Sequence, residues 1–284
     1  MILLYKCLCL QVSELIYFLC LKFIKFGFLI CIYLRLFLGA FVLIFLSSCD
    51  SENSFDCAQK AGDRIQKEFE VAEFNTIVVE ENLQLIVKEG PQQKVVVQTG
   101  KNLINDIKIS VTDGVLTLVN DNGCNLVRDY NITQIVVTSP NIETIRNASG
   151  YAVQSDGVLR YSSLTLLSED LEEEDKYHKD GDFRLELAVD SLKITANGLS
   201  NFFLSGTANA ANIELLEGDM RVEAQNLAVQ ELYVFHRGTQ KVIVNPIQSL
   251  RGKVLSTGDL ISVNRPPIVE VEETYTGKLI FEKE

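Results

Sequence analysis

Glycine recurs at a fixed spacing in the C-terminal third of this 284-residue chain. Gly198, Gly218, Gly238 and Gly258 follow one another at equal intervals of about 20 residues, a period typical of repeat proteins. Because one such segment of short strands cannot bury its own inner face, repeats of this kind have to stack on one another. The spacing therefore predicts stacked coils with glycine at one corner, where the backbone needs positive φ or close approach.

The segments around these glycines superpose as repeats, and they cover residues 192–211, 212–231, 232–251 and 252–271. The columns four residues before, four after and six after the glycine are mostly apolar, which predicts a continuous core. The register extends back to Gly150, whose distance from Gly198 fits two more coils if about ten extra residues are inserted near residues 169–180.

Upstream of the repeats, apolar and polar residues alternate over short runs, which predicts half-buried strands. The runs cover residues 76–80, 83–88, 94–98, 107–111, 115–119 and 134–138. Only residues 58–69 fit a short helical turn. We therefore expect residues 71–284 to form an all-β domain, a single-stranded right-handed parallel β-helix (solenoid) with about 20 residues per coil. A β-sandwich is the alternative, but it needs no unbroken glycine register.

An apolar leader precedes this domain. Residues 1–48 end in an apolar run followed by Leu46-Ser47-Ser48-Cys49. A cation, an apolar run and then small residues are typical of a secretory signal peptide, and the last four residues resemble the lipobox of bacterial lipoproteins. We expect residues 1–48 to be removed, Cys49 to carry a lipid, and residues 49–70 to form the lipidated tether. An uncleaved transmembrane anchor over residues 23–46 is the alternative.

Charge restricts the partners of the exported part. Subtracting the leader's four cations and one acid from the 26 basic and 38 acidic residues leaves 22 and 37, a formal charge of −15 over residues 49–284. Such a domain repels phosphates, which argues against nucleic-acid binding. We expect membrane attachment through Cys49 at the outer membrane, on its cell-surface or periplasmic face, and a polysaccharide or a protein as ligand. No cofactor is expected.

Two cysteines other than Cys49 remain after the leader. Cys57 and Cys124 could pair, because exported proteins occupy an oxidising compartment. Two unpaired thiols are the alternative. Isolated cysteines lack the spacing of metal ligands, so we expect no metal site.

Catalytic signatures are absent from the sequence, which has no G-x-S-x-G, H-E-x-x-H or phosphate-binding glycine loop. Its two histidines, His178 and His236, are both expected on the surface.

We expect a non-catalytic role, either adhesin-like or structural. A polysaccharide-acting β-helix enzyme is one alternative, and it would gather carboxylates and bases on one face. The candidates for that role are Asp219, Asp259, Arg221, Lys241 and Arg237. A periplasmic scaffold is the other alternative.

The acidic insertion, residues 169–182, is the most distinctive local segment. It could be a ligand or Ca²⁺ loop, although its spacing does not match an EF-hand. We expect a mobile loop whose like charges repel one another.

Five strand segments carry a family resemblance, residues 74–79 (FNTIVV), 85–90 (LIVKEG), 113–118 (DGVLTL), 135–140 (IVVTSP) and 145–150 (IRNASG). With the glycine-centred coils, they resemble the putative auto-transporter adhesin head GIN domain family of bacterial lipoproteins over about residues 69–264. The resemblance implies a parallel β-helix with no established biochemical activity. Residues 122–130 are similar to a subgroup in which this cysteine, Cys124, pairs with one near the mature N-terminus, here Cys57. The corners Gly-Asp-Met, Gly-Thr-Gln and Gly-Asp-Leu depart from the family's Gly-Ile-Asn, which weakens any function tied to corner residues.

Overall fold

The structure is a computed structural model that describes Phe37, Cys57, residues 59–126, Asp129, residues 132–171 and residues 176–282. The chain divides into two compact units, Met1–Ser54 and Phe55–Glu284. Cys49 and the leader other than Phe37 lie outside the described residues, so removal of the leader and lipidation stay predictions. Within the residues just named, no helix has the length and apolar character needed to cross a bilayer.

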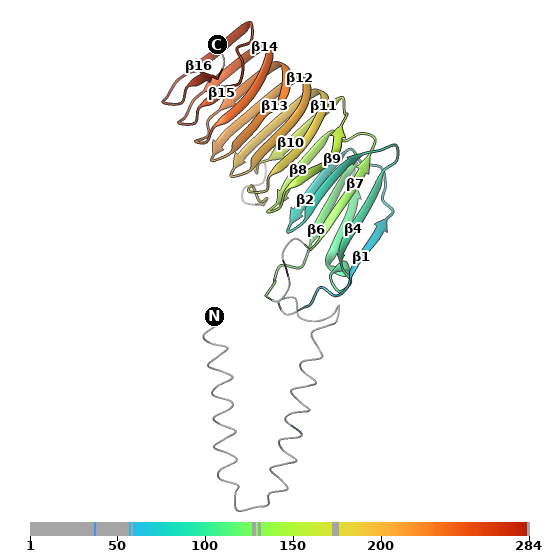
Figure 1. Ribbon diagram of the computed structural model, residues 1–284. Coiled ribbons are helices and arrows are strands. Elements are labelled where there is room, and N and C mark those ends of the chain that lie inside the picture. Colours follow the sequence, from blue (N-terminus) through green and yellow to red (C-terminus); the bar gives the residue numbers. More distant parts are fainter. Residues whose placement is uncertain are drawn as a thin grey trace, which may run out of the picture. The chain divides into compact units, whose positions relative to one another are not determined.

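Unit Phe55–Glu284 is all-β and consists of one curled, mostly parallel 17-stranded sheet (Figure 1). Its strands are β1 (Arg64–Phe69), β2 (Thr76–Glu81), β3 (Gln84–Glu89), β4 (Lys94–Gly100), β5 (Ile107–Thr112), β6 (Val115–Asn120), β7 (Gln134–Ser139), β8 (Thr144–Ser149), β9 (Val153–Leu159), β10 (Ser163–Ser168), β11 (Phe183–Gly198), β12 (Asn201–Gly218), β13 (Arg221–His236), β14 (Val242–Val254), β15 (Leu260–Ser262), β16 (Ile268–Glu273) and β17 (Leu279–Phe281). The short 3-10 helix η2 (Ile104–Asp106) joins β4 to β5.

The alternation of apolar and polar residues located the early strands well. Strands β2 to β7 each begin within one residue of an expected run, so the all-β prediction is confirmed. The expected helical turn over residues 58–69 is wrong, because Arg64–Phe69 forms β1 and pairs antiparallel with β4. Ile65 and Phe69 are partly buried there. The β-structure therefore begins inside the segment that we expected to be tether.

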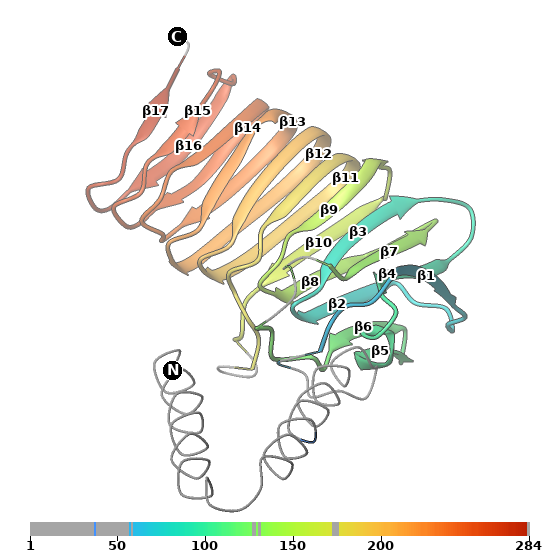
Figure 2. The same cartoon turned by 60° about the horizontal axis from the view of Figure 1, so that its bottom comes forward.

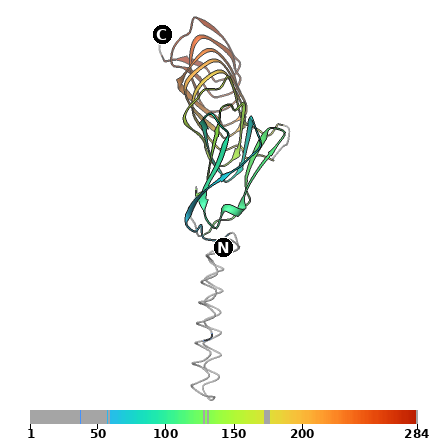
Figure 3. The ribbon, with the colours of Figure 1, turned by 90° about the vertical axis from the view of Figure 1, so that its right-hand side faces the viewer.

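The long strands give the sheet two walls. The first half of β11 pairs with β9 and its second half pairs with β10. The first wall contains β1, β4, β7, β3, β9, the first halves of β11 to β14, β15 and β17. The second wall contains β5, β6, β2, β8, β10, the second halves of β11 to β14, and β16. Figures 2 and 3 show this curled sheet from two further directions.

Inward side chains from both walls form one apolar core. Phe183 and Phe202 occupy matching positions on β11 and β12, and their rings stack with centroids 4.9 Å apart. Both side chains are fully buried. Burial of one such ring contributes about 1.5–3 kcal/mol, so repeated apolar columns hold the successive turns of the chain together.

The glycine spacing corresponds to the strand register. Phe183 pairs with Phe202 and Gly198 with Gly218, so the chain advances by about 20 residues from one turn to the next. Gly218 has a φ of +106°, and an added Cβ would lie 2.3 Å from the carbonyl oxygen of Gly198. The advance is larger between β10 and β11, where Ser163 pairs with Ser191. The extra residues are the acidic insertion, as expected from the position of Gly150.

The N-terminal part departs from a simple succession of coils. The pairs β1–β4, β4–β7 and β5–β6 are antiparallel. Strand β2 lies between β6 and β8, and β3 lies between β7 and β9. The expectation of uniform coils throughout residues 71–284 is wrong here, because alternation locates a strand without specifying its partners.

Candidate binding groove at the loop edge

Two long connections lie on the same edge of the sheet, where the chain passes from the second wall to the first. They follow β6 (residues 121–133) and β10 (residues 169–182), whereas β2 and β8 are followed by short turns at residues 82–83 and 150–152. Strands β2 and β8 pair with each other and lie between β6 and β10. The short turns therefore form a floor, and the described parts of the two long connections (residues 121–126, Asp129, residues 132–133, 169–171 and 176–182) lie on either side of it. We call this edge the loop edge and the space over its floor the groove.

Two cavities occupy the groove and share Tyr151. Each has a volume of about 300 Å³. The first is lined also by Asn82 and Asn120, and the second by Gln84 and Gln154. Ligand sites commonly span about 300–1,000 Å³, so the two cavities together have the size of a binding site.

Buried polar side chains fix the turn that carries Tyr151. Asn147 and Ser149 are almost completely buried. The Asn147 amide donates to the carbonyl oxygens of Tyr151 at 3.0 Å and Asp182 at 3.1 Å. The Ser149 hydroxyl accepts from the Tyr151 N–H at 3.1 Å and donates to the Leu83 carbonyl at 2.8 Å. The floor is thus held in place by buried hydrogen bonds.

A glycine allows the second long loop to approach this floor. An added Cβ at Gly181 would lie 2.1 Å from the carbonyl oxygen of Ser149 and 2.5 Å from the Asn147 amide nitrogen. Any side chain at this position would therefore push residues 180–182 away from the turn that carries Tyr151.

The acidic insertion is anchored at its beginning. Glu169 and Asp170 are 6% and 7% exposed. Arg146 donates to Glu169 Oε1 at 2.6 Å, and Lys179 donates to Asp170 Oδ2 at 2.6 Å. Asn197 also donates to Asp170 Oδ1 at 2.9 Å. The expectation of a mobile, self-repelling loop is therefore wrong for these two acids, because basic side chains neutralise them; residues 172–175 lie outside the described part.

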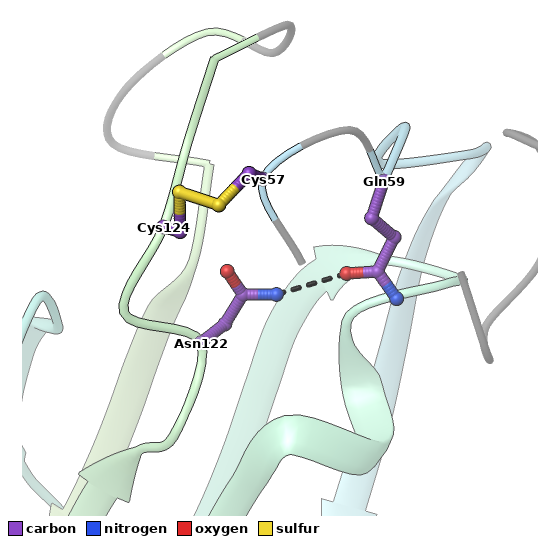
Figure 4. The surroundings of a disulfide bond; sticks show 4 residues. All are labelled: Cys57, Gln59, Asn122 and Cys124. Carbon is purple, nitrogen blue, oxygen red and sulfur yellow. Dashed lines mark hydrogen bonds between the residues drawn. A yellow bond between two sulfur atoms is a disulfide. The ribbon is translucent and has the colours of Figure 1, made fainter. Parts of the chain in front are cut away.

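A disulfide joins Cys57 and Cys124 beside the first long loop, with the two Cα atoms 4.5 Å apart (Figure 4). Two residues before Cys124, the buried Asn122 amide donates to Gln59 Oε1 at 2.8 Å. Asn122 also donates to Asp106 Oδ2 at 3.1 Å. The bridge and this amide pair together attach the loop to the N-terminal segment.

Charges around the groove are mainly negative. Asp180 and Asp129 are exposed. Asp182 accepts from Arg184 at 2.9 Å and from the Asn201 amide at 2.8 Å. The Arg184 guanidinium also lies 4.0 Å from the centroid of the Phe203 ring. The cation nearest the second cavity is therefore already engaged by a carboxylate and an aromatic ring.

The two histidines lie in different environments. His178 is exposed, with Nε2 3.7 Å from Glu81 Oε2. His236 is fully buried, so its expected surface position is wrong. Its Nδ1 accepts from the Gly238 N–H at 3.3 Å. Burial lowers the pKa of His236, and the backbone at Gln240 and the charge of Asp259 oppose that shift.

The charged corner residues considered for catalysis lie on the C-terminal part of the loop edge. Asp219 accepts from the Thr239 hydroxyl and, at 3.1 Å, from the Gln240 amide. Arg221 pairs with Glu223, and Asp259 Oδ1 accepts from the Lys278 N–H at 2.9 Å. Lys241 and Arg237 are exposed. In the described part of the chain, no group of three His, Cys, Asp or Glu side chains is arranged to hold a metal ion.

Sequence reasoning did not identify Tyr151, Asn147 or Gly181 as site residues. Tyr151 is a single tyrosine after a strand and belongs to no recognisable motif, so nothing in the sequence distinguishes it. Asn147 stands at an inward position within β8. Its amide at an inward position of a strand could have indicated a special role, because a buried polar side chain needs a defined hydrogen-bond partner.

A family model described as "Putative auto-transporter adhesin, head GIN domain" matches residues 73–266. No curated protein matches the chain in sequence. The fold of this chain is similar to that of a putative adhesin from Bacteroides fragilis NCTC 9343, with a TM-score of 0.67 at 20% identity over 77% of this chain and 97% of that one. A putative adhesin from Parabacteroides merdae ATCC 43184 has a TM-score of 0.56 at 15% identity, covering 78% and 96% of the two chains.

A third crystal structure, of a protein described as a putative lipid binding protein from Parabacteroides distasonis ATCC 8503, has a TM-score of 0.53 at 12% identity. That match covers 78% of this chain and 97% of the other. At these identities the similarities show a shared fold.

Proposed function

The chain belongs to the putative auto-transporter adhesin, head GIN domain family, and from this membership we propose that it is a non-catalytic, adhesin-like binding protein of the bacterial cell envelope. A lipid on Cys49 holds it at the outer membrane, and the groove at the loop edge receives its ligand, a polysaccharide or a protein. The observation that carries the proposal is the pair of cavities that meet at Tyr151 over a floor fixed by Asn147 and Ser149.

We also propose that the curled sheet is a single-stranded right-handed parallel β-helix with about 20 residues per coil. The recurrent parallel register from β11 onward and the stacked Gly198 and Gly218 support this architecture. A rod of this kind offers long flat walls and a continuous edge, and both suit recognition of an extended partner.

Protease treatment of intact cells tests the location. The full chain is expressed in its own type of cell, and the domain is followed by antibody. Loss of the signal without lysis is expected for a surface-exposed adhesin. Protection until the cells are lysed would refute the adhesin role and favour a scaffold on the periplasmic face.

Replacing Cys49 tests the anchor separately. The Cys49→Ala variant lacks the thiol that would take the lipid, so it should not incorporate labelled palmitate and should keep residues 1–48, whereas the native protein is labelled and shortened. Equal labelling and equal mass of the two proteins would contradict lipid attachment at this residue and support the transmembrane alternative.

A further inference from the structure

The groove is lined mainly by neutral side chains that form hydrogen bonds. Asn82 is exposed, and Asn120, Gln84 and Gln154 are partly exposed. An amide has donors and an acceptor at once. The carbonyl oxygens of Gln84 and Asn120 already accept from Gln134 at 3.0 Å and from the Asn122 N–H at 3.1 Å, so these two amides offer mainly their N–H donors and a second lone pair. Sugar hydroxyls have the same dual character, so cavities lined by several amides suit a ligand that is rich in hydroxyl groups.

Tyr151 occupies the junction of the two cavities. It is partly exposed, so its ring can contact a ligand while its backbone is held by Asn147 and Ser149. An aromatic ring with a polar tip suits a partner that has an apolar face and a polar rim. A pyranose ring has this combination, because its C–H groups form one face and its hydroxyls form the rim.

Electrostatics exclude anionic ligands from this position. The charged residues that line the two cavities are Asp129, Asp180, Asp182 and Arg184, and Arg184 is paired with Asp182. A phosphate or uronate would meet unbalanced carboxylates in a domain that is already strongly acidic. Peptides rich in lysine would be attracted, but neutral amides give their ammonium groups few specific contacts.

We propose that the groove binds an uncharged glycan chain, with one sugar ring on Tyr151 and neighbouring sugars in the two cavities. This inference rests on the proposed binding function and specifies its ligand class. The shared Tyr151 makes the two cavities adjacent subsites, so a linear oligosaccharide should bind better than a single sugar.

The test measures binding of the full protein, extracted from cells in detergent. The probes are cellohexaose and maltohexaose as neutral chains, glucose as the single sugar, hexagalacturonate as an anionic chain and hexalysine as a cationic peptide. We expect one of the neutral hexasaccharides to bind at least about tenfold more tightly than glucose, and hexagalacturonate not to bind.

Tyrosine variants assign the binding to the groove. Tyr151→Ala should weaken hexasaccharide binding by about tenfold, whereas Tyr151→Phe keeps the ring and should stay within about threefold. Tyr275→Ala is the matched control, because Tyr275 is 62% exposed and lies after β16 on the same edge, outside both cavities. Thermal unfolding followed by circular dichroism checks that each variant is folded.

Several results would overturn the inference. Binding of neither neutral hexasaccharide, or preferential binding of hexalysine or hexagalacturonate, would reject an uncharged glycan as the ligand. Equal effects of Tyr151→Ala and Tyr275→Ala would reject the groove as the location. If the protein is surface-exposed but fails this binding test, only the proposed ligand class is rejected. The proposed function is tested independently by protease treatment of intact cells.

Discussion

Replacing Gly218 by alanine places a methyl group where two turns of the chain make close contact. The residue has a φ of +106°, and the new Cβ would lie 2.3 Å from the Gly198 carbonyl oxygen. Strain at positive φ costs about 1–3 kcal/mol, and relief of the overlap costs about 1–3 kcal/mol more. The lower freedom of the unfolded chain returns only about 0.4–1 kcal/mol. We expect Gly218→Ala to lower the free energy of unfolding by about 1–5.6 kcal/mol.

Gly238→Ala is the matched control, because Gly238 and Gly218 occupy the same position in successive 20-residue repeats. Gly238 does not have a left-handed φ, and its added Cβ would lie 3.2 Å from His236 Cε1 and 3.3 Å from the Gly218 carbonyl oxygen. Shifts of a few tenths of an ångström relieve such contacts. We expect a change of about 1 kcal/mol or less in either direction.

Urea unfolding measures both variants. The chain contains no tryptophan, so the loss of β-structure is followed by far-ultraviolet circular dichroism, and midpoints are converted with a common m-value. Equal losses for the two variants would refute the argument. They would show that alanine is tolerated equally at Gly218 and Gly238, and that the close approach to Gly198 does not require glycine at position 218.

Three other changes test buried features. Replacing Cys57 and Cys124 by serine opens a loop closed at a separation of 67 residues, so the free energy of unfolding should fall by up to about 4.4 kcal/mol in urea titrations; no change would contradict a stabilising bridge. Glu169→Gln should cost about 3 kcal/mol in the same assay, because it removes the carboxylate that neutralises Arg146, a side chain only 15% exposed, and leaves it the Glu169 carbonyl and the Tyr177 ring as neutral partners; unchanged stability would contradict a stabilising ion pair. Burial lowers the pKa of His236, so the unfolded chain takes up a proton first below about pH 6.5 and stability should fall from pH 7 to pH 5; the same decline in His236→Gln would contradict this origin.

The sequence predicted the register of the C-terminal strands because repetition carries positional information, although it predicted short strands where β11 to β14 have 16, 18, 16 and 13 residues. Equal spacing puts Gly198 and Gly218 at equal positions on neighbouring turns, and apolar columns such as Phe202 and Val222 follow from that register. Alternation also located β2, β3, β6 and β7, since one face of each of these strands is buried.

Features that depend on contacts between distant residues could not be predicted. Arg146 and Glu169 are 23 residues apart, and nothing in the acidic run 169–182 shows which acids gain a basic partner. His236 looked like a surface residue because it stands beside an arginine near a glycine corner, yet it is an inward residue of β13. The floor of the groove required the pairing of β2 with β8, which local alternation does not specify.

If the chain is exported as proposed, the position of β2 has a consequence for the order in which its strands can pair. Thr76 of β2 pairs with Val115 of β6 and with Thr144 of β8. A chain that leaves the cytoplasm N-terminus first therefore releases β2 about 70 residues before its second neighbour appears. Until β8 appears, at least one edge of β2 stays free, which favours wrong pairing. The sheet around β2 therefore stays incomplete until β8 has emerged, whereas β11 to β14 pair in chain order and can be added one after another.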